Sequence, residues 1–101
     1  MPQITFAPQA VHDLNRLRIF LNGKSPSIAQ RALQKLLTSL KHLETHPELG
    51  RQVEDRSEEY RELIIPFGRN GYIAAYRYTE VELIVLGIWH QREDRSSSEL
   101  E

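Results

Sequence analysis

The stretch of sequence that decides the fold runs from residue 60 to residue 90 and reads YRELIIPFGRNGYIAAYRYTEVELIVLGIWH. Its apolar residues tend to recur at every second position, which is typical of β-strands. The pattern predicts three strands, Tyr60–Phe67, Tyr72–Tyr78 and Glu82–His90. Gly68-Arg69-Asn70-Gly71 is expected to form the first loop, with positive φ at Asn-Gly, and Thr79-Glu80-Val81 the second. Because the loops are short, consecutive strands should pair antiparallel.

A symmetric pairing about these loops sorts the side chains of the predicted sheet into two faces. This register places Glu62 opposite Arg77, as a cross-strand pair of opposite charge. One face is nearly all apolar, so we expect helices to cover it: Leu63, Ile65, Phe67, Tyr72, Ala74, Tyr76, Ile84, Leu86 and Ile88. The other face is too apolar for bare solvent, which implies a partner: Tyr60, Glu62, Ile64, Ile73, Ala75, Arg77, Leu83, Val85 and Trp89. A slip of one residue would exchange the faces.

Two amphipathic helices are predicted before these strands. The first begins at Pro8, and Asn22-Gly23 is expected to end it in a left-handed conformation; its buried stripe is Ala10, Leu14, Leu17 and Leu21. Ser25-Pro26 begins the second helix, which Pro47 ends. The core stripe of the second helix is Ala29, Ala32, Leu33, Leu36, Leu37, Leu40 and Leu43. The short link between the helices predicts an antiparallel hairpin.

The remaining segments complete an α+β fold. Gln3–Phe6 is predicted to be a short strand, and the polar residues 48–59 a surface connection with room for a turn of helix. The expected architecture is therefore an N-terminal strand and an antiparallel helical hairpin packed on an antiparallel sheet of three further strands. A chain of 101 residues should hold one domain, residues 1–95, and a flexible tail, 96–101, in which Leu100-Glu101 resembles a cloning remnant.

Composition excludes several classes of function. Thirteen basic and fourteen acidic residues give a net charge of −1, which argues against binding nucleic acid by bulk charge. The chain has no cysteine, which excludes disulfides and thiolate chemistry. His42 and His46 are one helical turn apart but have no third ligand nearby, so we expect neither a metal nor a cofactor. We find no signal peptide pattern and no membrane-length apolar run, and we therefore expect a cytoplasmic protein.

Arginines concentrate in the part of the chain that contains the three predicted strands. They are Arg51, Arg56, Arg61, Arg69, Arg77, Arg92 and Arg95, interleaved with tyrosines and Trp89. Guanidinium groups suit carboxylates and phosphates, so this composition fits an acidic protein partner or a nucleic-acid backbone. The same region carries many glutamates, so a solvated, salt-bridged sheet edge is an equally good interpretation. His90, beside Arg92, is the one plausible general acid or base, although an isolated strand-end histidine is more often structural.

The order of elements and three stretches of sequence resemble the RelE/ParE superfamily of toxins from bacterial type II toxin–antitoxin systems. The stretches are Tyr60–Gly68, Gly71–Tyr78 and Ile84–Glu93. The resemblance implies a toxin that is neutralised by a cognate antitoxin encoded beside it, of the ParD kind or similar. It also implies a toxin–antitoxin hetero-oligomer that contacts DNA through the antitoxin, and a role in plasmid stabilisation.

Two mechanisms exist within this superfamily. RelE-like members cleave messenger RNA on the ribosome, and their strand after the hairpin typically reads Gly-Tyr-Arg, with the arginine on the scissile phosphate. Here the stretch reads Gly71-Tyr72-Ile73, although His90 and Arg92 could keep part of an RNase site. ParE-like members are poisons of DNA gyrase and act by contact. The missing arginine favours a ParE-like gyrase inhibitor without catalytic residues. The alternatives are a ribosome-dependent mRNA interferase, and a degenerate toxin that only binds its antitoxin.

The antitoxin is expected to bind as an extended, acidic and amphipathic segment. Its apolar anchors would cover the second sheet face around Ile73, Val85 and Trp89, and its carboxylates would pair with the arginines. The predicted partner-binding residues are Arg61, Arg69, Arg77, Trp89 and Arg92.

Overall fold

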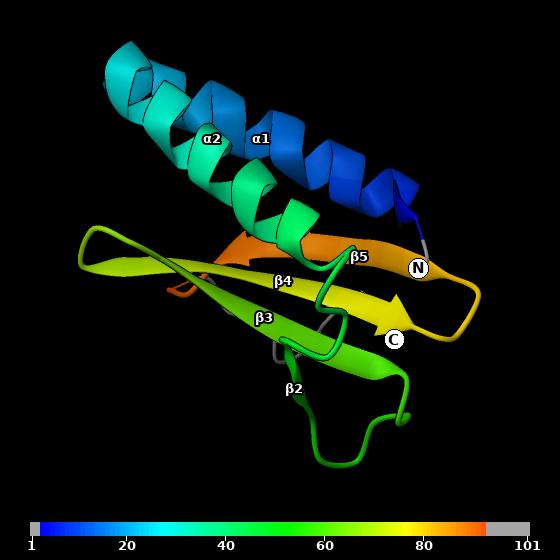
Figure 1. Cartoon of the computed structure of the whole chain (residues 1–101). Coiled ribbons are helices and arrows are strands. Elements are labelled where there is room, and N and C mark those ends of the chain that lie inside the picture. Colours follow the sequence, from blue (N-terminus) through cyan, green and yellow to red (C-terminus); the bar gives the residue numbers. More distant parts are fainter. Residues whose placement is uncertain (1–2, 93–101) are drawn as a thin grey trace.

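The computed structural model describes residues 3–92, so the predicted tail at 96–101 lies outside the described residues. The elements follow in the order β1 (Ile4–Phe6), α1 (Pro8–Lys24), α2 (Pro26–His42), β2 (Arg51–Gln52), β3 (Tyr60–Phe67), β4 (Asn70–Tyr78) and β5 (Leu83–His90). Figure 1 shows α1 and α2 as an antiparallel pair that covers one face of the sheet. The predicted α+β class, with a helical hairpin on a sheet, is confirmed.

The sheet has five strands in the order β1-β5-β4-β3-β2, and it is mixed. β1 extends one edge by pairing parallel to β5, with Ile4 opposite Leu83. β2 extends the other edge by pairing antiparallel to β3, with Arg51 opposite Glu62 and Gln52 opposite Arg61. The surface connection at residues 48–59, which had room for a turn of helix, instead contributes this short strand and turns around it.

Both helices begin with proline at a position where its missing N–H costs nothing. The predicted left-handed stop at Asn22-Gly23 is wrong, because α1 continues to Lys24 and ends where Ser25 is extended. Ser25 also caps α2, since its hydroxyl accepts a hydrogen bond from the Ile28 N–H at 3.4 Å. α2 ends at His42, before Pro47. Neither helix in residues 3–92 is long and apolar enough to cross a membrane.

The β3–β4 turn is shorter than predicted. Phe67 pairs with Asn70, so Gly68 and Arg69 alone form the turn, and the positive φ of 63° falls at Gly68 and not at Asn-Gly. Glycine at the first of two turn positions is typical of a type II′ turn. This shifts the expected register by two residues, so that Arg77 lies opposite Tyr60 and the predicted Glu62–Arg77 pair is wrong. An even shift leaves the faces of the two strands unchanged.

A β-bulge divides β5 into two parts. Ala75 pairs with Gly87 and Tyr76 with Val85, which leaves Leu86 without an opposite residue on β4. As a result, side chains on both sides of the bulge, Val85 and Ile88, belong to the core under the helices. The predicted faces are correct at Ile88 and Trp89. They are wrong in the first part of the strand: Leu83 and Val85 are in the core, whereas Leu86 packs in a cluster on the other face.

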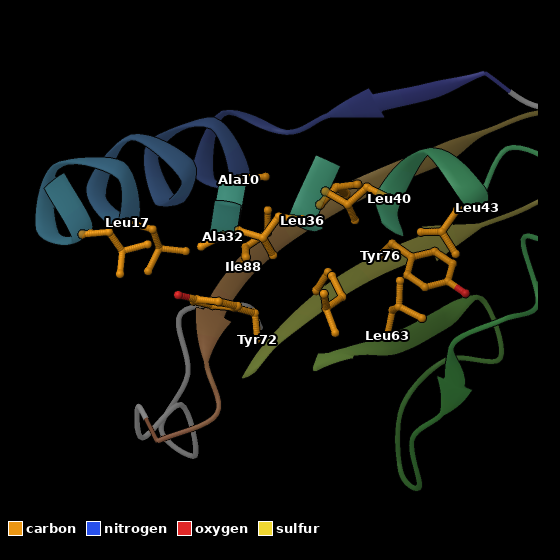
Figure 2. Close-up of a cluster of buried hydrophobic side chains, with 14 of the residues drawn as sticks. Ala10, Leu17, Ala32, Leu36, Leu40, Leu43, Leu63, Tyr72, Tyr76 and Ile88 are labelled. Carbon is orange, nitrogen blue, oxygen red and sulfur yellow. The ribbon is translucent and has the colours of Figure 1, made fainter. Parts of the chain in front are cut away.

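The core lies between the helical hairpin and the sheet. Figure 2 shows Leu17 and Tyr72 at one end of it, and Leu43, Leu63 and Tyr76 at the other. Five of the seven residues predicted for the second stripe are buried: Ala29, Ala32, Leu36, Leu40 and Leu43. Leu33 is half-buried, and Leu37 is exposed.

The Tyr76 hydroxyl fixes the chain between α2 and β2. It donates a hydrogen bond to the Pro47 carbonyl at 2.7 Å and accepts one from the Gly50 N–H at 2.8 Å. Burial raises the pKa of this hydroxyl above its ordinary value, which favours the protonated form that donates to Pro47. A Cβ on Gly50 would lie 2.6 Å from the Tyr76 ring, so only glycine fits there. Arg61 completes this contact by donating to the Gly50 carbonyl at 2.7 Å.

The sheet face away from the helices has a small cluster of its own. Tyr60, Ala75 and Trp89 form its buried part, and Val53, Ile73 and Leu86 pack against them. In Figure 1, β2 and the loop after it lie on this side of the sheet. The guanidinium of Arg56, from that loop, lies 3.9 Å from the centre of the Tyr60 ring. The chain thus covers much of the face that was expected to need a partner, although Ile64 is 47% exposed.

Most of β3 forms an outer edge of the sheet, because β2 pairs only with Arg61 and Glu62. The Tyr78 N–H donates to the Glu59 carbonyl, and alternation from that bond turns the backbone of Ile64 and Pro66 outward. Pro66 has no N–H to offer at this edge.

The Leu40→Ala substitution tests the packing of the hairpin on the sheet. Leu40 is buried in the core, so its truncation should leave a cavity and lower the free energy of unfolding by about 2–5 kcal/mol. Leu37→Ala, on the exposed side of the same helix, is the matched control, with an expected change within about 0.5 kcal/mol. Urea denaturation measures both values, and equal losses would contradict the packing described here.

Candidate functional site

A cleft of about 540 Å³ opens between the second half of α1 and the sheet. In Figure 1, the α1–α2 turn and the β3–β4 turn project at the same end of the molecule, one above the other. The residues that line the cleft come from α1, from the β3–β4 hairpin and from the end of β5: Arg16, Leu17, Phe20, Leu21, Lys24, Phe67, Tyr72, His90 and Arg92. This cleft, named the α1 cleft below, joins segments far apart in the sequence.

Apolar and cationic groups share the α1 cleft. The leucines at 17 and 21 are buried, whereas Phe20 is 57% exposed at the side of α1. The Lys24 ammonium lies 5.1 Å from the centre of the Phe20 ring, which is a cation–π distance. Arg16, Lys24 and Arg92 are cations, and the described lining residues include no carboxylate. The α1 cleft therefore suits a ligand that is both apolar and anionic.

A buried carboxylate, Asp13, lies next to the cleft residue Arg16 and connects α1 to β5. Asp13 is 1% exposed, and its Oδ2 accepts a hydrogen bond from the Ile88 N–H at 2.9 Å. Its Oδ1 accepts from the Gln9 side chain at 3.0 Å and lies 3.8 Å from Nη2 of Arg16. Asp13 thus joins α1 to β5 beyond the point where β1 stops pairing, and it holds the Arg16 guanidinium beside the α1 cleft.

His90 lies in the α1 cleft with its ring orientation fixed. Its Nδ1 accepts a hydrogen bond from the Arg92 N–H at 3.1 Å, and the ring packs edge-on against Tyr72, with centroids 5.3 Å apart. The neutral imidazole therefore carries its proton on Nε2. Taking a proton on Nδ1 would break the Arg92 contact, which disfavours His90 as a general base in this arrangement.

The predicted partner-binding residues do not form one site. Arg92 lines the α1 cleft, and Arg69 is exposed at the β3–β4 turn. Arg61 holds the Gly50 carbonyl, and Arg77 is 3.4 Å from Glu82. Trp89 is only 5% exposed, within the cluster on the far face. The structure therefore brings together the two residues of the RNase alternative, His90 and Arg92, and distributes the others over the sheet.

Ile73, which stands where RelE-like toxins typically have arginine, packs against the cluster of Tyr60, Ala75 and Trp89. It lies opposite Trp89 on β5, on the sheet face away from the α1 cleft. An aliphatic side chain offers no hydrogen bond to a phosphate, so this position adds nothing to the charge near His90.

The two histidines at helical spacing show no sign of a metal site. His46 Nδ1 is 2.9 Å from the Thr45 hydroxyl, and His42 is exposed. Within residues 3–92, no group of three or more histidine, aspartate or glutamate side chains could hold a metal ion.

Four residues of the site were missed from sequence: Asp13, Arg16, Phe20 and Lys24. One signal was present for Asp13, because it lies three residues after Ala10 and four before Leu17, on the buried stripe of α1. A charged residue at such a position is almost never buried unless it has a partner. The other three lie beside this stripe, and nothing local distinguishes them from solvent-facing residues.

A family model and two curated proteins that match this chain are all described as toxins. The family model described as "ParE toxin of type II toxin-antitoxin system, parDE" matches residues 4–95. "Toxin RelE3" of Caulobacter vibrioides is 35% identical over 95 residues, which is 94% of this chain and 100% of that protein. "Toxin RelE1" of the same organism is 36% identical over 87 residues, covering 86% of this chain and 90% of that protein.

Two solved structures share the fold. One, described as the chromosomal ParDE toxin–antitoxin system from P. aeruginosa, superposes with a TM-score of 0.73 at 22% identity, covering 89% of this chain and 96% of that chain. A conserved hypothetical protein from Helicobacter pylori superposes with a TM-score of 0.51 at 16% identity, covering 92% of this chain and 98% of that chain. At these identities the likeness concerns the fold.

Asp13→Ala tests the support of the α1 cleft. The substitution leaves the buried Ile88 N–H without its acceptor, so the free energy of unfolding should fall by about 1–3 kcal/mol. Asp13→Asn keeps an oxygen that can accept from Ile88 and should cost less. Urea denaturation of both variants makes the comparison. A loss below about 0.5 kcal/mol for Asp13→Ala would show that this bond does not hold α1 to β5.

Proposed function

Because the chain belongs to the ParE toxin family of type II toxin–antitoxin systems, we propose that it acts as a toxin that inhibits DNA gyrase by contact, without a catalytic step. Membership of such a system implies an antitoxin as partner. The proposed gyrase target rests on the resemblance to the ParE-like branch of the superfamily, whose members are described as poisons of this enzyme.

The observation that carries the proposal is the position of Ile73. In RelE-like enzymes an arginine at this point stabilises the scissile phosphate, and such an electrostatic contact typically contributes about 2.7–4 kcal/mol to a transition state. Here the side chain is aliphatic and packs against the cluster that contains Trp89. Inhibition by contact needs no such clamp, whereas RNA cleavage of the RelE kind would lack this arginine.

The orientation of His90 agrees with this proposal. Its Nδ1 is already bonded to the Arg92 N–H, so the ring cannot take a proton on that nitrogen without losing the contact. General acid–base groups typically contribute about 10²–10⁴-fold to a rate. A toxin that acts by contact would not depend on this group.

A ribosome-dependent mRNA interferase is the second candidate function. Two observations favour it: both curated relatives carry the name RelE, and His90 and Arg92 lie together in the α1 cleft. These two side chains would be the catalytic residues in that case. A degenerate toxin that only binds its antitoxin is a third candidate, and it would be inactive in both assays described below.

We place the toxin in the cytoplasm, where gyrase acts, within a hetero-oligomer that contacts DNA through the antitoxin. The proposed antitoxin contacts are Arg61, Arg69, Arg77, Trp89 and Arg92. Arg69, Arg77 and Arg92 are exposed and suit the carboxylates of an acidic segment. Arg61 and Trp89 are engaged within the fold, so we expect them to support neighbouring contacts.

Two parallel assays test the target. Purified toxin is added to a gyrase supercoiling reaction and, separately, to a translating ribosome extract. We expect cleaved DNA to accumulate in the first reaction and messenger RNA to stay intact in the second. Codon-specific cuts in the mRNA, with gyrase unaffected, would establish the second candidate function in place of the first.

His90→Ala tests the mechanism in cells. If the toxin acts by contact, the variant should retain most of the growth arrest caused by the wild-type chain, since no proton transfer is lost. Thermal unfolding serves as the control for folding, because His90 lines the α1 cleft and its loss can also change the binding of a partner. Complete loss of toxicity with an unchanged unfolding temperature would contradict a non-enzymatic mechanism.

A further inference from the structure

We propose that the α1 cleft is the docking site for an acidic segment of the antitoxin, which inserts an apolar side chain between Phe20 and the β3–β4 hairpin. The inference rests on the proposed function only in taking an antitoxin as the partner. Of the partner-binding residues predicted from sequence, Arg92 lines this cleft. The strongest contact is assigned to Phe20, which that prediction did not include.

The shape and lining of the α1 cleft point to an apolar anchor. Its volume of about 540 Å³ can hold a large side chain and part of the backbone that carries it. Leu17 and Leu21 provide an aliphatic wall, and Phe67 and Tyr72 provide aromatic surface on the sheet side. Phe20, although 57% exposed, belongs to the same lining. An exposed aromatic residue beside a buried apolar wall is a common position for a binding hot spot.

The charge of the α1 cleft points to an acidic segment around that anchor. Three cations, Arg16, Lys24 and Arg92, line it, whereas the chain as a whole carries a net charge of −1. Attraction of an anionic partner must therefore be local. Asp13 balances part of the Arg16 charge and holds this guanidinium in place before binding, so Lys24 and Arg92 carry most of the attraction for an anionic partner.

Single-stranded nucleic acid is the rival occupant, since aromatic rings can stack on bases and cations can bind phosphates. Two features favour the peptide. The wall formed by α1 is aliphatic at Leu17 and Leu21, which suits a branched or aromatic side chain better than a stacked base. The net charge of −1 also gives no long-range attraction for a polyanion.

The test uses matched pairs of variants on the helices. Phe20→Ala removes the exposed aromatic ring from the lining of the α1 cleft, and Ile19→Ala removes the neighbouring side chain, which is 64% exposed and outside the lining. Lys24→Glu reverses a cleft cation, and Lys35→Glu reverses an exposed cation on α2. Thermal unfolding of each variant reports whether the fold is retained.

Binding is measured with the antitoxin expressed from the gene that adjoins the toxin gene. The toxin is separated from the co-expressed complex, refolded and bound to immobilised antitoxin at two salt concentrations. We expect Phe20→Ala to raise the dissociation rate at least about tenfold, and Lys24→Glu to slow association at low salt and less so at high salt. The Ile19 and Lys35 controls should stay within about twofold of the wild-type rates.

Equal effects of the cleft and control variants, or no complex with the wild-type chain, would overturn the proposal. A fluorescent single-stranded oligonucleotide is the second probe: binding that needs Phe20, together with unchanged antitoxin rates, would assign the α1 cleft to nucleic acid. The gyrase assay on antitoxin-free toxin is read separately. A toxin that leaves gyrase active but loses antitoxin through Phe20→Ala would refute the gyrase proposal and support the docking site.

Discussion

The bulge at Leu86 is the constraint on which the arrangement of the two faces depends. Counting from the Tyr78–Leu83 pair, a regular strand would turn Leu83, Val85, Gly87 and Trp89 toward the helices. One extra residue reverses the alternation after Val85, so that Ile88 enters the main core and Trp89 enters the cluster on the far face. His90 reaches the α1 cleft for the same reason. The α1 cleft, the main core and the cluster on the far face thus all depend on the bulge at Leu86.

The sequence was sufficient to predict the helical hairpin, the three long strands and the side-chain faces of β3 and β4, because each has a clear period. It was insufficient for β5, where residues 83–89 read LIVLGIW. A run that is apolar throughout contains no alternation to mark the bulge. β2 was missed for a related reason: two exposed residues, Arg51 and Gln52, form a strand only because β3 offers an open edge.

The candidate site was harder to predict than the fold, because its residues meet only in three dimensions. The arginines illustrate the difficulty. Arg61, Arg77 and Arg92 all come from the part of the sequence that forms the sheet, yet one holds the Gly50 carbonyl, one lies among glutamates, and one lines the α1 cleft. Composition reports how many guanidinium groups are present, whereas their roles depend on which carbonyls and carboxylates the fold brings near. Arg16, Phe20 and Lys24 share a cleft with the β3–β4 hairpin only in the folded chain, so no local sequence pattern marks them.

The proline at the open edge of β3 bears on the period when a toxin is without its antitoxin. An exposed strand edge can template the stacking of further chains into β-aggregates, and a row of outward N–H and C=O groups makes this more favourable. Pro66 interrupts that row. A strand arriving alongside β3 could pair with the N–H of Ile64 but would find no N–H at residue 66. Ile64 itself is apolar and exposed, so without the proline this edge would favour association with another chain. Pro66 therefore makes edge-to-edge pairing between two copies of this chain less favourable.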